Sequence, residues 1–305
     1  MGFSGKIRRF SWSDVPQITD LFNRINGLDG SERAWGEEYM RQFLSLPSCD
    51  PEQHCFLALN DSNPVGFLLV SYEEPIGRTV ASGGVLEDYR NRGIGRELLT
   101  TAVSHARELG VSVLHIEASS ESGSANHLLM SEGFHIVKRF WQMQWKGDEA
   151  PAVDVPDGFA LRPFRLGEDE EALTELQNAA FGENWGFSPN TVEQIAARVR
   201  LSPDDPEGII LVMDGERVAA YDWTLQSLGA AGSIGWISMT GVHPDYRGKG
   251  LGTLVVTAGI THLKANGVDT VELEVDSDNV AARELYLKLG FKKLRETSWY
   301  ERRFD

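Results

Sequence analysis

The sequence predicts a protein of the α/β (α+β) class, built from two tandem copies of one domain. Residues 85–134 and 242–291 align without a gap at a constant offset of 157 positions, and roughly a third of the aligned residues are identical. In each copy, an apolar strand precedes a glycine-containing loop and a helix, and a second apolar strand follows. A chain of 305 residues is long enough for two domains that each bury a core. A repeat of this size indicates a duplicated domain rather than a solenoid unit.

Hydrophobic periodicity and turn residues predict the elements of the first copy in order. Apolar runs predict strands at Ile7–Phe10, His54–Leu59, Val65–Tyr72, Thr79–Val85, Val111–Ala118 and Phe134–Trp145. Apolar residues at three- and four-residue spacing predict helices at Asp14–Ile25, Glu37–Leu46, Ile94–Leu109 and Ser124–Ser131. Gly110 follows the third of these helices, where a C-capping glycine is expected.

The same order of elements returns after an acidic, proline-containing stretch. The expected strands are Phe159–Phe164, Gly208–Met213, Arg217–Thr224, Ile234–Val242, Thr270–Val275 and Phe291–Phe304. The expected helices are Glu168–Phe181, Thr191–Val199, Leu251–Ala265 and Asn279–Leu289. We therefore expect one domain at 1–147, a linker at 148–157 and a second domain at 158–305.

Composition excludes several classes of function. The formal charge of −16 argues against a general binder of nucleic acid or of anionic membranes, because both need a basic surface. Two cysteines, Cys49 and Cys55, form neither a disulfide framework nor a zinc site, so reduced thiols and no metal are expected. No run approaches the ~20 apolar residues of a membrane span, and no signal peptide is visible. The expectation is a cytoplasmic protein, either a monomer or a homodimer.

The loop before the helix of the second copy has the features of an anion site. It reads Arg247-Gly-Lys-Gly-Leu-Gly252 and leads directly into the helix. A helix N-terminus carries unpaired N–H groups and partial positive charge, which suits a phosphate. Glycines allow the backbone to approach the anion closely and to adopt positive φ. The first copy repeats the pattern at Arg90, Gly93 and Gly95.

This loop together with a second, downstream motif resembles the GNAT superfamily of N-acetyltransferases. The downstream motif of the second copy is Asn279-x-Ala-Ala-x-x-x-Tyr286-x-x-x-Gly-Phe291. The resemblance covers both halves and implies two tandem GNAT domains, each a mixed, mostly antiparallel sheet flanked by helices. It also implies acetyl-CoA as the acyl donor and a small-molecule amine as the acceptor.

The resemblance places the cofactor at the opening of the second-copy helix. The CoA pyrophosphate is expected on backbone N–H groups of Arg247, Gly248, Lys249, Gly250, Leu251, Gly252 and Thr253. The pantetheine arm is expected to bond to the strand end at Thr240, Gly241 and Val242, where that strand parts from its neighbour. Val85, Arg90, Gly93 and Gly95 are the corresponding cofactor positions of the first copy.

Tyr286 lies where the family places the acid that protonates the sulfur of CoA. A phenol with a pKa near 10 is matched to a departing alkyl thiolate. The alternative is that Tyr286 is a core residue, since Ala282, Leu285 and Leu289 share its helix face. Asn279 is expected to cap the N-terminus of this helix or to contact the cofactor.

The general base is less clearly marked. Histone-type relatives carry a glutamate six positions before the valine of the strand, and Trp236 stands there in this chain. Glu272 and Glu274 share one strand face and either could bind or deprotonate an amine through water, unless they are ordinary solvated or paired carboxylates. Asp222 and Trp223 are expected to wall the acceptor site or to pack in the core.

The first copy has Leu129 in place of the acid and Ser122 in place of Asn279. We therefore expect it to be catalytically degenerate, and the second copy to carry the activity. The leading function is acetyl-CoA-dependent N-acetylation of a primary amine of a small molecule. The alternatives are acetylation of a cysteinyl sugar amine of the mycothiol-synthase type, acetylation of a protein or peptide N-terminus, and a non-catalytic acyl-CoA-binding module.

Overall fold

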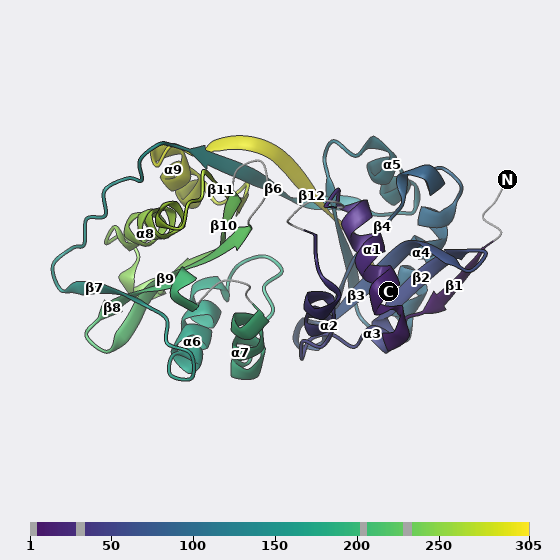
Figure 1. The fold of residues 1–305 in the computed structure, drawn as a ribbon, viewed down its shortest axis with the longest axis horizontal. Helices are drawn as coiled ribbons and strands as arrows, with labels where there is room; N and C mark the ends of the chain where they lie inside the picture. Colours follow the sequence, from purple (N-terminus) through teal and green to yellow (C-terminus); the bar gives the residue numbers. More distant parts are fainter. Residues whose placement is uncertain (1–4, 29–33, 202–205, 228–233, 305) are drawn as a thin grey trace. The chain divides into compact units, whose positions relative to one another are not determined.

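The computed structural model describes residues 5–28, 34–201, 206–227 and 234–304, which form two compact units (Figure 1). Unit 1 comprises residues 1–138 and 297–305, and unit 2 comprises residues 139–296. Each unit is a mixed, mostly antiparallel sheet with helices, so the expected fold class is confirmed. None of the helices in the described ranges is long and apolar enough to cross a membrane.

Unit 1 has a sheet in which one parallel pair interrupts antiparallel neighbours. Its strands in spatial order are β1 (Lys6–Arg9), β2 (Cys55–Asn60), β3 (Asn63–Glu73), β4 (Arg78–Val85), β5 (Val113–Ser119) and the end of β12 (Lys292–Arg303). Its helices are α1 (Val15–Ile25), α2 (Glu37–Leu44), α3 (Pro51–His54), α4 (Ile94–Glu108) and α5 (Gly123–Ser131). The parallel pair is β4 with β5, and α4 connects these two strands.

Unit 2 repeats this plan. Its strands in spatial order are β6 (His135–Lys146), β11 (Thr270–Asp276), β10 (Ile234–Val242), β9 (Arg217–Ser227), β8 (Ile209–Asp214) and β7 (Phe159–Pro163). Its helices are α6 (Glu170–Phe181), α7 (Val192–Leu201), α8 (Leu251–Ala265) and α9 (Val280–Lys288). The hairpin of β8 and β9 turns at Gly215 with φ of 57°, as the Asp-Gly pair predicts.

Each face of the sheet in unit 2 is covered by its own pair of helices. Leu273 and Val275 pack with α8 and α9, whereas Tyr221 and Trp223 pack with α6 and α7. Figure 1 shows the two helix pairs on opposite sides of β9 and β10. The two faces of a strand therefore lead to two different cores, which decides what each alternate side chain can reach.

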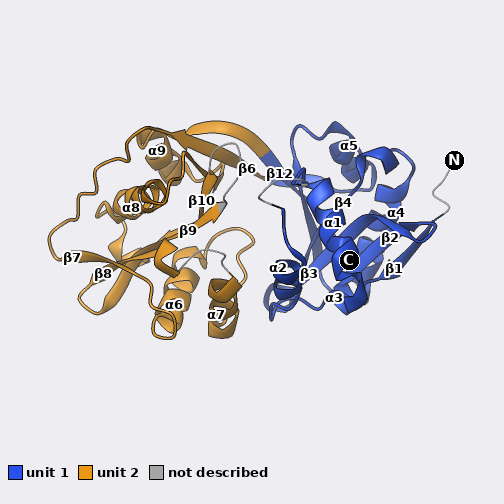
Figure 2. Cartoon of the chain, viewed as in Figure 1, with its two compact units in different colours: residues 1–138, 297–305 blue, residues 139–296 orange. Residues whose placement is uncertain are grey.

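The last strand of each half pairs with a strand from the other half of the chain. Strand β6 pairs with β11 from Thr270↔Lys146 to Asp276↔Phe140, and the end of β12 pairs with β5 from Thr297↔Ser119 to Arg303↔Val113. Figure 2 shows β6 and β12 each changing unit along their length. The expected boundaries at 147 and 158 therefore do not coincide with the units, and 148–157 connects two strands of unit 2. Because both strands align in the repeat, the sequence does not distinguish which sheet edge each one joins.

Candidate active site

The strands β10 and β11 of unit 2 separate part-way along their length. They pair in parallel from Ile234↔Thr270 to Ile237↔Leu273, whereas β10 continues to Val242 and β11 to Asp276. A register shift between Ile237 and Met239 adds a bulge in β10 at the same point. In the described strands, the β10–β11 ladder does not continue past this point, so the end of β10 can offer backbone groups to an amide-bearing ligand arm. Bulges of this kind are frequent beside active sites.

The glycine loop lies at the end of β10 and opens α8. Gly248 and Gly250 have φ of 79° and 81°, in the left-handed region that other residues adopt at a cost. A Cβ atom on Gly252 would lie 3.1 Å from Cδ1 of Leu285, so the helix start packs closely on α9. The first N–H groups of this 15-residue helix have no intrahelical acceptor. The predicted phosphate position thus has both the backbone conformation and the donors that it requires.

The cations of the loop are engaged with the protein itself. The Arg247 guanidinium donates from Nη2 to the carbonyl oxygen of Ala180 at 2.9 Å, which ties the loop to the end of α6. The ammonium of Lys249 lies 4.6 Å from the ring centroid of Tyr246, whose hydroxyl donates to Asp214 at 2.9 Å. The Arg247 side chain is thus used within the protein, while the backbone N–H groups of the loop and the charge of the exposed Lys249 remain for an anion.

Tyr286 lies on α9, the helix that packs against the start of α8, and is 8% exposed. Its ring makes an edge contact with Phe291, with 5.7 Å between centroids. Burial raises the pKa of the phenol above its usual value, and the nearby Asp222 carboxyl raises it further when it is ionised. The hydroxyl makes no hydrogen bond to any residue that the structure describes. The ring is thus part of the core, as one reading of the sequence held, while its hydroxyl remains available to a ligand.

Asn279 begins the same helix. Its Oδ1 accepts from the backbone N–H of Ala282 at 3.1 Å, which confirms the predicted N-cap. A contact between Asn279 and the cofactor stays a prediction.

The two candidate bases of β11 differ in their surroundings. Glu272 is 5% exposed and accepts from Nε2 of Gln142 at 2.6 Å and from Nε2 of Gln144 at 2.7 Å. Gln142 in turn accepts from Arg295. Glu274 has an exposed side chain on the same strand face. Sequence reasoning missed the glutamine pair because β6 reaches this sheet from the first half of the chain.

Asp222, on β9, is a further ionisable group next to this site. It is 0% exposed, and its Oδ1 accepts a short hydrogen bond from the hydroxyl of Thr240, which lies opposite it on β10. Burial raises its pKa well above the usual range of a carboxyl, against the opposing effect of the Thr240 hydrogen bond. Asp222 and Trp223 are thus core residues, and neither walls an open acceptor site.

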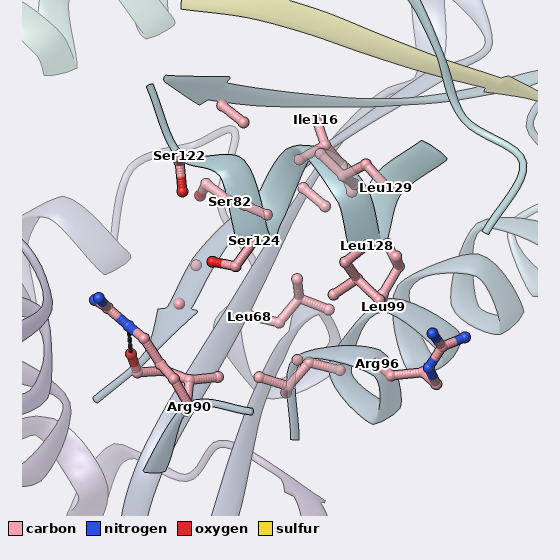
Figure 3. Close-up of a pocket in the computed structure, with 18 of the residues that line it drawn as sticks. Leu68, Ser82, Arg90, Arg96, Leu99, Ile116, Ser122, Ser124, Leu128 and Leu129 are labelled. Carbon is pink, nitrogen blue, oxygen red and sulfur yellow. Dashed lines mark hydrogen bonds between the residues drawn. The ribbon is translucent and has the colours of Figure 1, made fainter. Parts of the chain in front are cut away.

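The corresponding gap of unit 1 is a cavity of about 610 Å³ (Figure 3). Its lining includes the four residues predicted there from the repeat, Val85, Arg90, Gly93 and Gly95. Gly93 has φ of 88°, and Arg90 donates from Nε to the Val85 carbonyl at 3.1 Å. Leu129 occupies the place of Tyr286 and is 5% exposed. The cavity therefore has the backbone of a phosphate site and no proton donor at the position of Tyr286.

Comparison with known families gives a direct result. The model of the acetyltransferase (GNAT) family matches residues 15–134 and again residues 170–291. The chain belongs to this family. It is an N-acetyltransferase with tandem domains, and membership implies acetyl-CoA as the donor.

Similar proteins support the same conclusion. Mycothiol acetyltransferase of Thermobispora bispora is 32% identical over 265 residues, covering 85% of this chain and 87% of that protein. Mycothiol acetyltransferase of Pseudarthrobacter chlorophenolicus is 33% identical over 267 residues, covering 82% of this chain and 81% of that protein. Among solved structures, a tandem GNAT protein from the clavulanic acid biosynthesis pathway has a TM-score of 0.74 at 20% identity, covering 98% of each chain. A GCN5-related N-acetyltransferase from Sphaerobacter thermophilus has a TM-score of 0.73 at 24% identity, covering 99% of this chain and 97% of that one. The two structures share the fold.

Proposed function

We propose that unit 2 transfers the acetyl group of acetyl-CoA to a primary amine of a small molecule, with Tyr286 as the proton donor. The observation that carries this proposal is the buried Tyr286 hydroxyl, which has no hydrogen-bond partner among the described residues. It is close enough to Asp222 to respond to that carboxyl's charge, and Asp222 lies opposite Thr240, in the part of β10 that no longer pairs with β11. A buried phenol without a protein partner is suited to bond to a ligand atom.

The reaction balances with the groups at hand. The neutral amine attacks the thioester carbon, the new C–N bond forms, and the C–S bond breaks with its electron pair on sulfur. Tyr286 gives its proton to that sulfur, and the proton lost by the amine passes through water to a carboxylate. Tyr286 stays protonated at neutral pH because its pKa is raised. Burial raises the pKa of a thiol as well, so the two groups remain comparable as acids in the same site.

The carboxylate that receives the amine proton is proposed to be Glu274. Both oxygens of Glu272 already accept from glutamine amides, at 2.6 and 2.7 Å, so Glu272 is held in place and is suited to bind the ammonium form of the acceptor. Glu274 is exposed on the same face and can exchange a proton with water. The aromatic side chain of Trp236 stands where the histone-type base would be.

The similarity to mycothiol acetyltransferases favours a second, narrower candidate. At 32% identity over 85% of the chain, an acceptor related to that of the relatives, a cysteinyl sugar amine, is proposed as the first compound to test. Unit 1 is proposed to hold a CoA-like ligand without turnover, since it keeps the loop of Gly93 and Gly95 but carries Leu129.

The test is an amine panel incubated with acetyl-CoA, in which free thiol release and the acetylated product are both measured. The panel contains a cysteinyl amino sugar, simple amino sugars, polyamines and a peptide with a free N-terminus. We expect thiol release that depends on one class of small amine. Binding of CoA without release of free thiol for any amine would contradict the proposal. Preferential acetylation of the peptide would show that the acceptor is a peptide N-terminus rather than a small-molecule amine.

A further inference from the structure

The carboxyl group of Asp222 is buried in unit 2 with half of its hydrogen-bonding capacity unused. Its Oδ1 accepts from Thr240, while Oδ2 has no partner in the part of the chain that the structure describes. On the facing helix α8, a Cβ atom at Gly259 would lie 1.9 Å from Oδ2. Only glycine therefore leaves room for this carboxyl, so the helix is fitted to it.

The duplicated domain shows that the fold does not need this group. The register pairs Thr240 with Asp222 in unit 2 and Gly83 with Leu68 in unit 1, and the offset of 157 relates Gly259 to Ala102. The four positions thus read Asp222, Thr240, Gly259 and Tyr286 in unit 2, and Leu68, Gly83, Ala102 and Leu129 in unit 1. Unit 1 folds with apolar residues at each of these places, so the polar set in unit 2 is tied to its chemistry.

The positions that correspond to Asp222, Thr240 and Tyr286 line a cavity in unit 1. Leu68, Gly83 and Leu129 all line the cavity of unit 1. Their counterparts Asp222, Thr240 and Tyr286 therefore occupy equivalent positions in unit 2, where Asp222 is enclosed in the core. The proposed proton donor, Tyr286, belongs to the same set of positions.

The charge state of Asp222 follows from its neighbours. The elements packed against it bring Thr240 from β10, Gly259 from α8, Ile210 from β8 and Tyr286 from α9. Among the described residues no cation contributes to its ionisation, and burial raises its pKa. The titratable groups that respond to its charge are Tyr286 and the adjacent Tyr221. A wholly buried carboxyl with one donor is neutral in ordinary conditions.

We propose that Asp222 is a positioning residue held as the neutral acid, and that its ionisation stops Tyr286 from donating a proton. The inference rests on the proposed function of Tyr286. Proton transfer to sulfur leaves a phenolate on Tyr286, and a carboxylate beside that phenolate would oppose the transfer by like-charge repulsion. A neutral carboxyl does not oppose it. Asp222 itself gains and loses no proton during turnover.

The first experiment is the pH profile of kcat for wild type, Asp222→Asn and Thr240→Val, with Tyr221→Phe as a control. Asn has the shape of the neutral acid and does not ionise, so the alkaline fall in kcat should move upward by about one pH unit or more in Asp222→Asn. Thr240→Val removes the donor that favours the carboxylate and should move the fall in the same direction. Tyr221→Phe removes a neighbouring phenol that packs on the other face of the sheet and should not move it.

A second measurement does not depend on turnover. The infrared difference spectrum of wild type minus Asp222→Asn should contain the band of a protonated carboxylic acid at neutral pH. Absence of that band, superimposable pH profiles, or loss of kcat at every pH in a folded Asp222→Asn protein would each overturn the inference. If no amine is acetylated at all, the proposed function fails, and the infrared band still decides the state of Asp222.

Discussion

Replacing Tyr286 by phenylalanine isolates the proposed proton donor. The hydroxyl makes no hydrogen bond to a described residue, and the ring contact with Phe291 at 5.7 Å is unaffected by the change. The free energy of unfolding should therefore change by less than about 1 kcal/mol. The substitution is expected to destabilise only the transition state of acetyl transfer. A general acid accelerates such a step by about 10²–10⁴-fold, which corresponds to about 3–5 kcal/mol of activation free energy.

The assay is a rapid-quench single turnover with acetyl-CoA and the best amine of the panel. A single turnover measures the chemical step even if release of CoA limits kcat. We expect the rate constant of transfer to fall by about 10²-fold or more, while the Kd for acetyl-CoA changes little. Tyr221→Phe is the matched control, because it also removes a buried phenol hydroxyl from unit 2, but from β9 and from the core on the other face of the sheet. A fall of less than threefold in Tyr286→Phe, or an equal fall in both variants, would refute the assignment.

Three further changes test other parts of the account. Gly250→Ala places a side chain at φ of 81° in the phosphate loop, and the Kd for acetyl-CoA, measured by calorimetry, should rise with a stability cost of about 1 kcal/mol. Leu129→Ala removes a buried side chain that lines the cavity of unit 1 and should lower the free energy of unfolding by about 2–5 kcal/mol in denaturant titrations, with kcat close to wild type. Asp222→Asn should change the pH dependence of stability. The pKa of Asp222 is raised in the folded protein, so the neutral carboxyl contributes fully to the free energy of unfolding below the unfolded-state pKa of about 4. As the pH rises from there toward the folded-state pKa, this contribution is lost at about 1.4 kcal/mol per pH unit. Thermal unfolding of the two proteins should therefore diverge in favour of Asp222→Asn as the pH is raised, and parallel curves would contradict the buried neutral acid.

Local chemistry made much of the fold predictable. The duplication was visible as a constant offset of 157 residues. The Asp214-Gly215 turn and the glycines before each long helix were predictable because each acts through its own backbone conformation. The N-cap at Asn279 followed from the same local rules.

Contacts between distant parts of the chain were not predictable. The pairing of β6 with β11 depends on the free edge that a strand meets, which periodicity does not encode, and it brings Gln142 and Gln144 to Glu272. The role of Arg247 also differed from its local pattern, because its partner is a carbonyl 67 positions away. The sequence did not decide whether Asp222 lines the acceptor site or packs in the core. The closeness of its carboxyl to Gly259 on α8, far away in the chain, shows how completely it is enclosed.

A matched pair of loop variants distinguishes the proposed catalytic unit 2 from the proposed inactive unit 1. Gly95 and Gly252 occupy equivalent positions, and an added Cβ atom would lie 3.4 Å from Leu128 in one unit and 3.1 Å from Leu285 in the other. Thiol release from acetyl-CoA is measured for Gly95→Val and Gly252→Val, each checked for folding by circular dichroism. We expect Gly252→Val to lose acetyl transfer and Gly95→Val to retain it. Equal losses, or a loss only in Gly95→Val, would show that unit 2 is not the catalytic unit.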